Sequence, residues 1–335
     1  MVDMADMDGM PNMSIESLPL SAPREANWRK MLVAIPGTSL ILLLLVLWFS
    51  FQGVDFAKPS NIVNIGIQSS VLLLLALPLT FILMSEGLDL SQGAVLSLAS
   101  VVLAAVLAHG GSLPLALTAA AALGLLFGAV NGAFIAYLQM PPFVVTLGTL
   151  GLAHGIALVA TDGESITEIG SQLPRLYKAT VLGIPFPIIV ALCAYALFHY
   201  LLYHTRFGSY VSAQGGNREA LHLAGVNANR HLVVVYLIGG LMVGLAALLW
   251  VGRISSGHPT AGHGMEFDAL VAVLLGGTRL EKGYGTMPGT LIGVLTVGVL
   301  RNGLNLMSVA ASWQVVSLGV LVLAALWVES RQGEK

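Results

Sequence analysis

Charged residues are scarce in this sequence. Asp, Glu, Lys and Arg together make up 10% of the 335 residues, whereas a soluble domain carries about 25%. Hydrophobic residues make up 56%, and the mean hydropathy is +0.85. The deficit in charge extends along the whole chain, which excludes an ordinary soluble protein. We therefore predict an all-α integral membrane protein, in which each span needs about 20 apolar residues.

Cysteine and enzyme motifs are also scarce. Cys193 is the single cysteine, so no intrachain disulfide can form. The sequence has no Walker-type phosphate-binding loop, no H-E-x-x-H motif and no paired-cysteine metal site. The net charge of −2 argues against a nucleic-acid partner. We therefore expect a chain that is not an enzyme and that binds no metal or cofactor of its own.

The chain divides into a polar N-terminal segment and a long apolar region. Residues 1–30 lack the apolar centre and cleavage site of a secretory signal, and we predict a disordered cytoplasmic tail. Residues 31–330 form the predicted transmembrane domain, a bundle of about ten helices. The predicted helices are 31–51, 62–84, 88–108, 113–138, 143–160, 181–203, 232–252, 266–277, 286–303 and 312–328. Two of these are weak: 266–277 is short for about 30 Å of hydrocarbon, and 88–108 begins in a charged, glycine-flanked turn.

The distribution of Lys and Arg sets the predicted orientation. With ten crossings and the N-terminus inside, the inside segments contain Arg24, Arg29, Lys30, Arg206, Arg218, Arg230, Arg279, Lys282, Arg331 and Lys335. The outside segments contain Lys58, Arg175, Lys178 and Arg253, and the loop after Arg253 is predicted to lie outside as well. This bias predicts that both termini and the 204–231 loop are cytoplasmic.

Ionisable side chains are nearly absent from the middle of the predicted spans. Asp89, Glu266 and Asp268 are the candidates, and all three lie at predicted helix starts, where acidic side chains also cap free N–H groups. An ion-coupled carrier usually buries ionisable residues at mid-membrane, and this class remains the alternative. A pathway without its own energy source is what the membrane subunit of an ATP-driven importer requires.

Two segments hint at an internal repeat. Residues 87–93 and 283–289 each have glycine at the first and seventh positions, and each leads into an apolar helix. Transporters often contain repeats with interrupted segments near the substrate path. In a chain with 38 glycines the match can also arise by chance, so both interpretations stay open.

The long predicted inside loop, 204–231, contains signals for a short helix. Asn217 is a good N-cap, residues 218–223 follow as a helical turn, and Gly225 fits a C-terminal cap. A peripheral ATPase could grip such a surface helix. The alternative is a solvated connecting loop.

Three segments give the chain a family resemblance. They are Ser85–Gly93 with the pattern G-L-D-L-S-Q-G, Gly208–Arg230 with A-Q-G-G-N and A-G-V-N-A-N-R, and the stretch from Pro259 to Gln314. In order and spacing they resemble the permeases of monosaccharide ABC importers, the group that includes ribose, arabinose, xylose and galactose permeases. The resemblance covers nearly the whole chain after residue 30. It implies a fold like that of the vitamin-B12 importer permease in the bacterial inner membrane.

The resemblance also implies partners and site residues. The partners are an ABC ATPase that binds ATP and Mg, a periplasmic sugar-binding protein, a second permease chain and membrane lipids. The implied ATPase-coupling residues are Gly208, Gly215, Gly216, Asn217, Glu219, Ala220, Gly225 and Asn227. Polar residues that could line the translocation path are Asp89, Ser91, Asn131, Asp268, Asn302 and Asn305. Permeases for nucleosides or branched-chain amino acids share the architecture and stay as alternatives.

One departure from the family pattern bears on substrate. Arg301 stands where the family commonly has asparagine, and it could touch a polar substrate or pair with a helix end.

Overall fold

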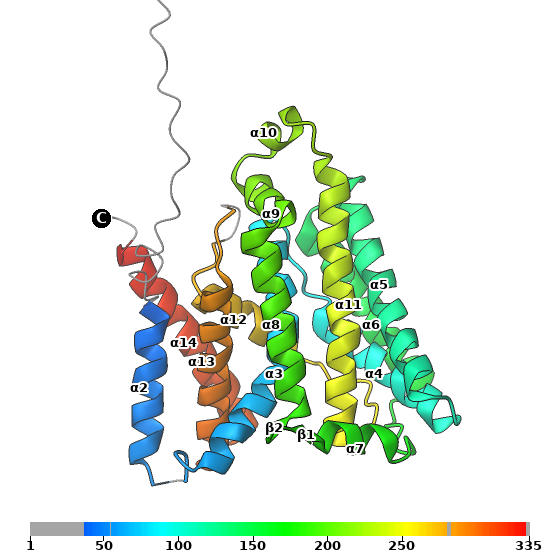
Figure 1. Cartoon of the computed structure of the whole chain (residues 1–335), viewed down its shortest axis with the longest axis vertical. Coiled ribbons are helices and arrows are strands. Elements are labelled where there is room, and N and C mark those ends of the chain that lie inside the picture. The colour runs from blue at the N-terminus through cyan, green and yellow to red at the C-terminus, as the bar shows by residue number, and fades with distance from the viewer. Residues whose placement is uncertain (1–36, 54, 280–282, 333–335) are drawn as a thin grey trace, which may run out of the picture. The chain divides into compact units, whose positions relative to one another are not determined.

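The computed structural model describes residues 37–53, 55–279 and 283–332 (Figure 1). These residues are almost entirely helical, as the composition predicts. The helices are α2 (Gly37–Phe51), α3 (Pro59–Met84), α4 (Gln92–Ala108), α5 (Leu113–Ala136), α6 (Pro142–Thr161), α7 (Gln172–Lys178), α8 (Phe186–His204), α9 (Arg206–Gly216), α10 (Arg218–Leu223), α11 (Ala228–Ile254), α12 (Met265–Leu275), α13 (Met287–Leu306) and α14 (Ala311–Gln332). The predicted tail, residues 1–30, lies outside the described residues.

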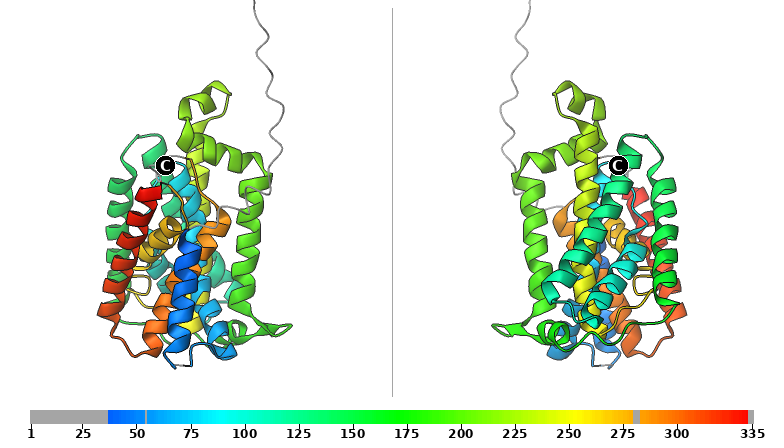
Figure 2. Two further views of the ribbon diagram at one scale, coloured as in Figure 1. Left: turned by 90° about the vertical axis from the view of Figure 1, so that its left-hand side faces the viewer. Right: turned by 90° about the vertical axis from the view of Figure 1, so that its right-hand side faces the viewer.

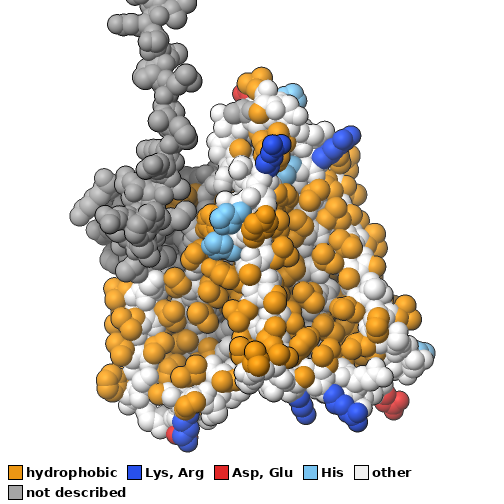
Figure 3. All heavy atoms as spheres, in the orientation of Figure 1, with side chains coloured by type: hydrophobic (Ala, Val, Ile, Leu, Met, Phe, Trp, Pro, Cys, Tyr) orange, Lys and Arg blue, Asp and Glu red, His pale blue; other side chains and the backbone are white. Residues whose placement is uncertain are grey.

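Six helices are long and apolar enough to cross a membrane: α3, α5, α6, α8, α11 and α13. Helices α2, α4 and α14 contain shorter apolar stretches. The prediction of a helical membrane protein is therefore confirmed, whereas the number of ten spans stays a prediction. Figure 3 shows hydrophobic side chains over the middle of the bundle and Lys and Arg towards its two ends, the distribution that a bilayer favours.

The helices differ in how much of their surface the bundle covers. In α3, 89% of the most apolar window is buried, compared with 28% in α5, α6 and α8. The core therefore lies around α3, which packs against α11, α12 and α13. Helices α5, α6 and α8 keep broad apolar faces exposed, as expected of helices whose outer surface contacts lipid.

Three short elements were not predicted from the sequence. A two-stranded antiparallel hairpin, β1 (Thr180–Val181) and β2 (Ile184–Pro185), occupies the predicted start of span 181–203, so that α8 begins only at Phe186. Leu182 and Gly183 at its turn both have positive φ. Helix α7 precedes this hairpin and packs against α11. Helix α9 was expected to be loop and is described below.

Helices α4 and α12 begin inside the bundle, after non-helical segments. Residues 85–91 lead from the end of α3 into α4, and residues 255–264 lead from the end of α11 into α12. The two segments meet where Gly93 and Gly262 are packed backbone to backbone: a Cβ on Gly93 would come within 2.4 Å of the Gly262 oxygen. The Gly262 N–H also donates a hydrogen bond of 2.8 Å to the Ser97 hydroxyl.

This arrangement corrects one prediction. The segment after Arg253 was expected to be an outside loop, but it re-enters the bundle as far as Gly93. The segments that meet in the core are those before α4 and before α12, whereas the predicted repeat compared 87–93 with 283–289. An internal repeat stays a prediction. The glycine spacing of 283–289 marks instead the close contact of Gly289 with Gly276.

The described ends of the chain lie on one side of the bundle. In Figures 1 and 2, α2 begins and α14 ends at the end where α9 and α10 lie. The opposite end carries the hairpin and α7. This agrees with an orientation in which the termini and the 204–231 loop share one side, and which side is cytoplasmic stays a prediction.

Candidate functional site

The connection between α8 and α11 forms the most prominent polar projection of the bundle. Helix α10 stands beyond the ends of the long helices, and α9 lies beneath it (Figure 2). The predicted helix at residues 218–223 coincides with α10. Helix α9 was missed, although Phe207, Val211 and Gln214 have helical spacing and Val211 is fully buried.

Helix α9 is anchored to the ends of two central helices. The Phe207 ring packs edge-on against Phe81 of α3, with 5.6 Å between ring centroids. Gln214 Oε1 and His231 Nδ1, at the start of α11, are 2.9 Å apart. Gly215 lies so close to α3 that a Cβ would come within 1.9 Å of the Met84 oxygen. A displacement of α9 would therefore push directly on α3 and α11.

Helix α10 ends in a Schellman motif. Gly225 has φ +77°, its N–H donates to the His222 oxygen at 2.9 Å, and the N–H of Val226 donates to the Leu221 oxygen at 3.3 Å. Leu221 is buried, whereas Leu223 at the tip is 81% exposed. The short helix is thus fixed from one side and presents an apolar residue to the outside.

The predicted coupling residues fall into two groups. Gly208 and Gly215 are buried in the packing of α9, and Gly216, Asn217, Glu219, Gly225 and Asn227 are exposed on or beside α10. The backbone of Ala220 belongs to α10, and its side chain lies outside the described part of the structure. A hollow beside α10 is lined by Arg218, His222, Gly225, Val226, Asn227, Ala228 and Asn229. These residues form one connected, mainly polar surface.

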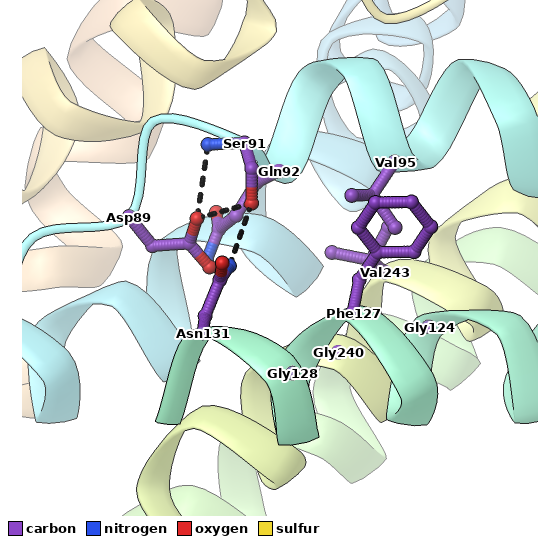
Figure 4. A pocket seen from close by; sticks show the side chains of 10 residues that line it. All are labelled: Asp89, Ser91, Gln92, Val95, Gly124, Phe127, Gly128, Asn131, Gly240 and Val243. Carbon is purple, nitrogen blue, oxygen red and sulfur yellow. Dashed lines mark hydrogen bonds between the residues drawn. The ribbon is translucent and has the colours of Figure 1, made fainter. Parts of the chain in front are cut away.

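Inside the bundle, a chain of hydrogen bonds connects α4, α5 and α6. The Asp89 carboxylate accepts from the Ser91 N–H at 2.9 Å and from the Ser91 hydroxyl at 2.6 Å (Figure 4). Asn131 Nδ2 donates to the Ser91 hydroxyl at 3.0 Å, and the Thr149 hydroxyl donates to Asn131 Oδ1 at 2.8 Å. All four side chains are buried. Gln92 lines the same cavity, which has room for about one water molecule.

Asn302 takes part in a second buried contact. Its amide and that of Asn61 in α3 exchange two hydrogen bonds, of 2.9 and 3.1 Å. Asn61 was not identified from the sequence, because its partner is 241 residues away. Of the proposed path residues, Asp89, Ser91, Asn131 and Asn302 thus hold helices together in this conformation.

The remaining two proposed path residues are Asp268, which is buried, and Asn305. Asn305 is exposed near the end of α13. Asp268 accepts a hydrogen bond from Arg301 Nη2 at 2.5 Å, and together they form an ion pair between α12 and α13. Asp268 was expected to cap α12, but it lies within the helix, and the N-cap residue is Gly264 with φ +85°. Glu266 Oε1 instead accepts from the Gly264 N–H at 3.3 Å.

The described residues contain no group of three or more His, Cys, Asp or Glu side chains that could hold a metal ion. The molecule defined so far is a polytopic membrane protein with two interrupted segments in its core and a helical projection at one end. A helical bundle with interrupted segments in its core is typical of a membrane transporter.

Comparison with known proteins identifies the family. The chain belongs to the family described as branched-chain amino acid transport system / permease component, whose profile matches residues 61–326. It is 37% identical to the ribose import permease protein RbsC of Escherichia coli (strain K12) over 87% of this chain and 92% of that protein. It is 38% identical to RbsC of Bacillus subtilis (strain 168), over 88% and 92%.

A third relative has a different sugar in its name. The D-allose transport system permease protein AlsC of Escherichia coli (strain K12) is 34% identical over 87% of this chain and 90% of that protein. No solved structure matches the chain significantly. Family membership establishes a multi-pass permease component of an ABC importer in the bacterial inner membrane.

Proposed function

We propose that the chain is the transmembrane subunit of a binding-protein-dependent ABC importer for a monosaccharide or a related small polyol. The observation that carries this proposal is the near full-length similarity to permeases named for ribose and allose. On this proposal the chain itself has no ATPase site, and ATP and Mg are held by the partner subunit.

The α9–α10 projection is the proposed contact with the ATPase. Asn217, Glu219 and Gly225 would meet a groove of the partner, with the exposed Leu223 as an apolar anchor. Gly216, Ala220 and Asn227 would complete this surface. Because α9 is wedged against the end of α3 and the start of α11, closure of the ATPase would move the two central helices. This gives a physical route for alternating access.

The remaining partners follow from the orientation. With α10 in the cytoplasm, the end that carries α7 and the hairpin faces the periplasm, where a soluble sugar-binding protein would dock. The translocation path would lie between this chain and a second permease chain, in an arrangement like that of the vitamin-B12 importer. In that arrangement the buried Asp89, Ser91, Asn131 and Asn302 would support the wall of the path, and Asp268 and Asn305 would lie nearer its lumen.

The test is uptake by proteoliposomes that contain this chain, the candidate ATPase and the candidate binding protein. Radiolabelled pentoses, hexoses, polyols and branched-chain amino acids form the panel, because the family profile is described by the last of these. Sugar uptake that requires both ATP and the binding protein supports the proposal. Uptake of amino acids would show that the proposed substrate class is wrong. Uptake driven by an ion gradient with this chain alone would show that the protein is a secondary carrier.

A further inference from the structure

The Arg301–Asp268 ion pair lies deep in the bundle. Helices α12 and α13 run antiparallel in close contact, with Gly276 against Gly289 and the Ala272 oxygen against Gly293. These contacts are four residues apart on each helix, so one more turn towards the start of α12 places Asp268 level with about residue 297, in the middle of α13. Arg301 is one turn further along α13, and because helical side chains lean towards the N-terminus, its guanidinium reaches back to Asp268.

The pair is not fully enclosed by the chain. The Arg301 side chain is 36% exposed, and that of Asp268 is 11% exposed. A charged side chain in the hydrocarbon centre costs about 2.5–3.5 kcal/mol or more, and such residues face a protein interior or a water-filled space. The exposed side of Arg301 is therefore unsuited to lipid.

A second observation points to water on the same part of the molecule. The segment 255–264, which leads into α12, is non-helical although it lies against α4, where Gly257 contacts Ser100 and Gly262 contacts Gly93. Within it, Thr260 and His263 are exposed. Irregular backbone at membrane depth occurs where protein buries it or where it lines a water-filled cavity. Because the polar side chains of this segment are exposed, we infer that it lines a water-filled cavity.

We propose that Arg301 lines the aqueous substrate path and hydrogen-bonds the hydroxyl groups of the passing substrate, while Asp268 positions its guanidinium. The substrate class rests on the proposed function. Arginine has five N–H donors, and the contact with Asp268 leaves others for substrate oxygens. Because Asp268 neutralises the charge, the site favours an uncharged polyhydroxylated molecule over an anion. Asn305, one turn away on the same face of α13, extends the polar surface.

Water access is tested by cysteine labelling of the full importer in proteoliposomes. Arg301→Cys is placed in a Cys193→Ala background and treated with a membrane-impermeant, sulfonate-bearing methanethiosulfonate. The native chain is the matched control, because Cys193 is exposed on α8 among exposed apolar residues. We expect modification of the cysteine at position 301, slowed by substrate, and none of Cys193. Equal protection of both thiols, at rest and during ATP turnover, would overturn the proposal.

Substrate contact is tested by selectivity. Uptake of a transported sugar and of its deoxy analogue is compared in the native importer, Arg301→Lys, Arg301→Gln and the control Arg253→Gln. If Arg301 contacts the substrate in the transition state, Arg301→Gln should change the ratio of sugar uptake to deoxy-sugar uptake by about tenfold, equivalent to about 1.4 kcal/mol. Arg301→Lys should partly restore the native ratio. Equal loss for both sugars would show a merely structural role and refute the contact. If the native importer takes up no sugar, the proposed function fails, while the labelling result still decides whether Arg301 faces water.

Discussion

The cap of α10 offers the sharpest test of the coupling surface. Gly225 has φ +77°, a conformation that costs an L-residue about 1–2 kcal/mol. Helix α10 has only six residues and cannot be stable without its tertiary contacts and caps. We therefore expect Gly225→Ala to lower the ratio of formed to frayed α10 by a factor of about 5 to 30, and to lower ATP-dependent uptake in the same direction.

Gly151→Ala, outside the coupling surface, is the control for an exposed glycine. Gly151 lies in α6, has no positive φ, and a Cβ there would meet nothing within 4 Å. The assay is hydrogen exchange of the α10 amides in the assembled importer, together with uptake and ATPase activity. Faster exchange and weaker coupling in Gly225→Ala alone support the reasoning. Native exchange and uptake in Gly225→Ala would refute it, because the strain would then have no effect on the coupling surface.

Three further predictions concern coupling and packing. Glu219→Lys reverses an exposed charge on α10 and should leave the protein in the membrane but reduce uptake, whereas native uptake would argue against an ATPase contact there. Gly93→Ala brings a Cβ within 2.4 Å of the Gly262 oxygen and should lower the yield of folded protein in detergent, since overpacking costs about 1–3 kcal/mol. A double-mutant cycle with Asn61→Ala and Asn302→Ala, measured by reversible unfolding in detergent, should give a coupling energy of about 0.6–1.7 kcal/mol, and a coupling of zero would show that their hydrogen bonds contribute nothing.

Local signals explain which parts of the fold were predictable. The apolar runs located the helices, and the Asn217 and Gly225 signals located α10 to the residue, because capping depends on neighbours in sequence. Helix α9 lacked such signals: its helical form is stabilised by burying Phe207 and Val211 against α3 and the surrounding core. Its tertiary contacts could not be read from the loop alone.

The polar sites show the same division between local and distant contacts. The Asp89–Ser91 hydrogen bonds join residues two apart, so a turn before α4 was a reasonable expectation. Arg301 and Asp268 are 33 residues apart, and Asn61 and Asn302 are 241 apart. Only the antiparallel packing of α12 on α13, and of α13 on α3, brings these side chains together. The re-entry of segment 255–264 was missed for the same reason, since its polar residues are typical of an external loop.

The packing of the core connects the coupling surface to the interrupted segments. Gly215 of α9 abuts the end of α3, and α3 packs along both α12 and α13. Residues 85–91 begin where α3 ends, so a shift of Met84 would also act on the turn that holds Asp89. The Tyr236 hydroxyl, in α11, donates to the Leu88 oxygen at 3.1 Å and ties this turn to the second helix that α9 contacts. Movement of α9 would therefore displace the start of α4 through both α3 and α11. Helix α12, with Asp268, and helix α13, with Arg301, would be displaced through α3 alone. A coupling defect confined to α10 should consequently leave the water access of Arg301 at rest unchanged while abolishing its change during ATP turnover.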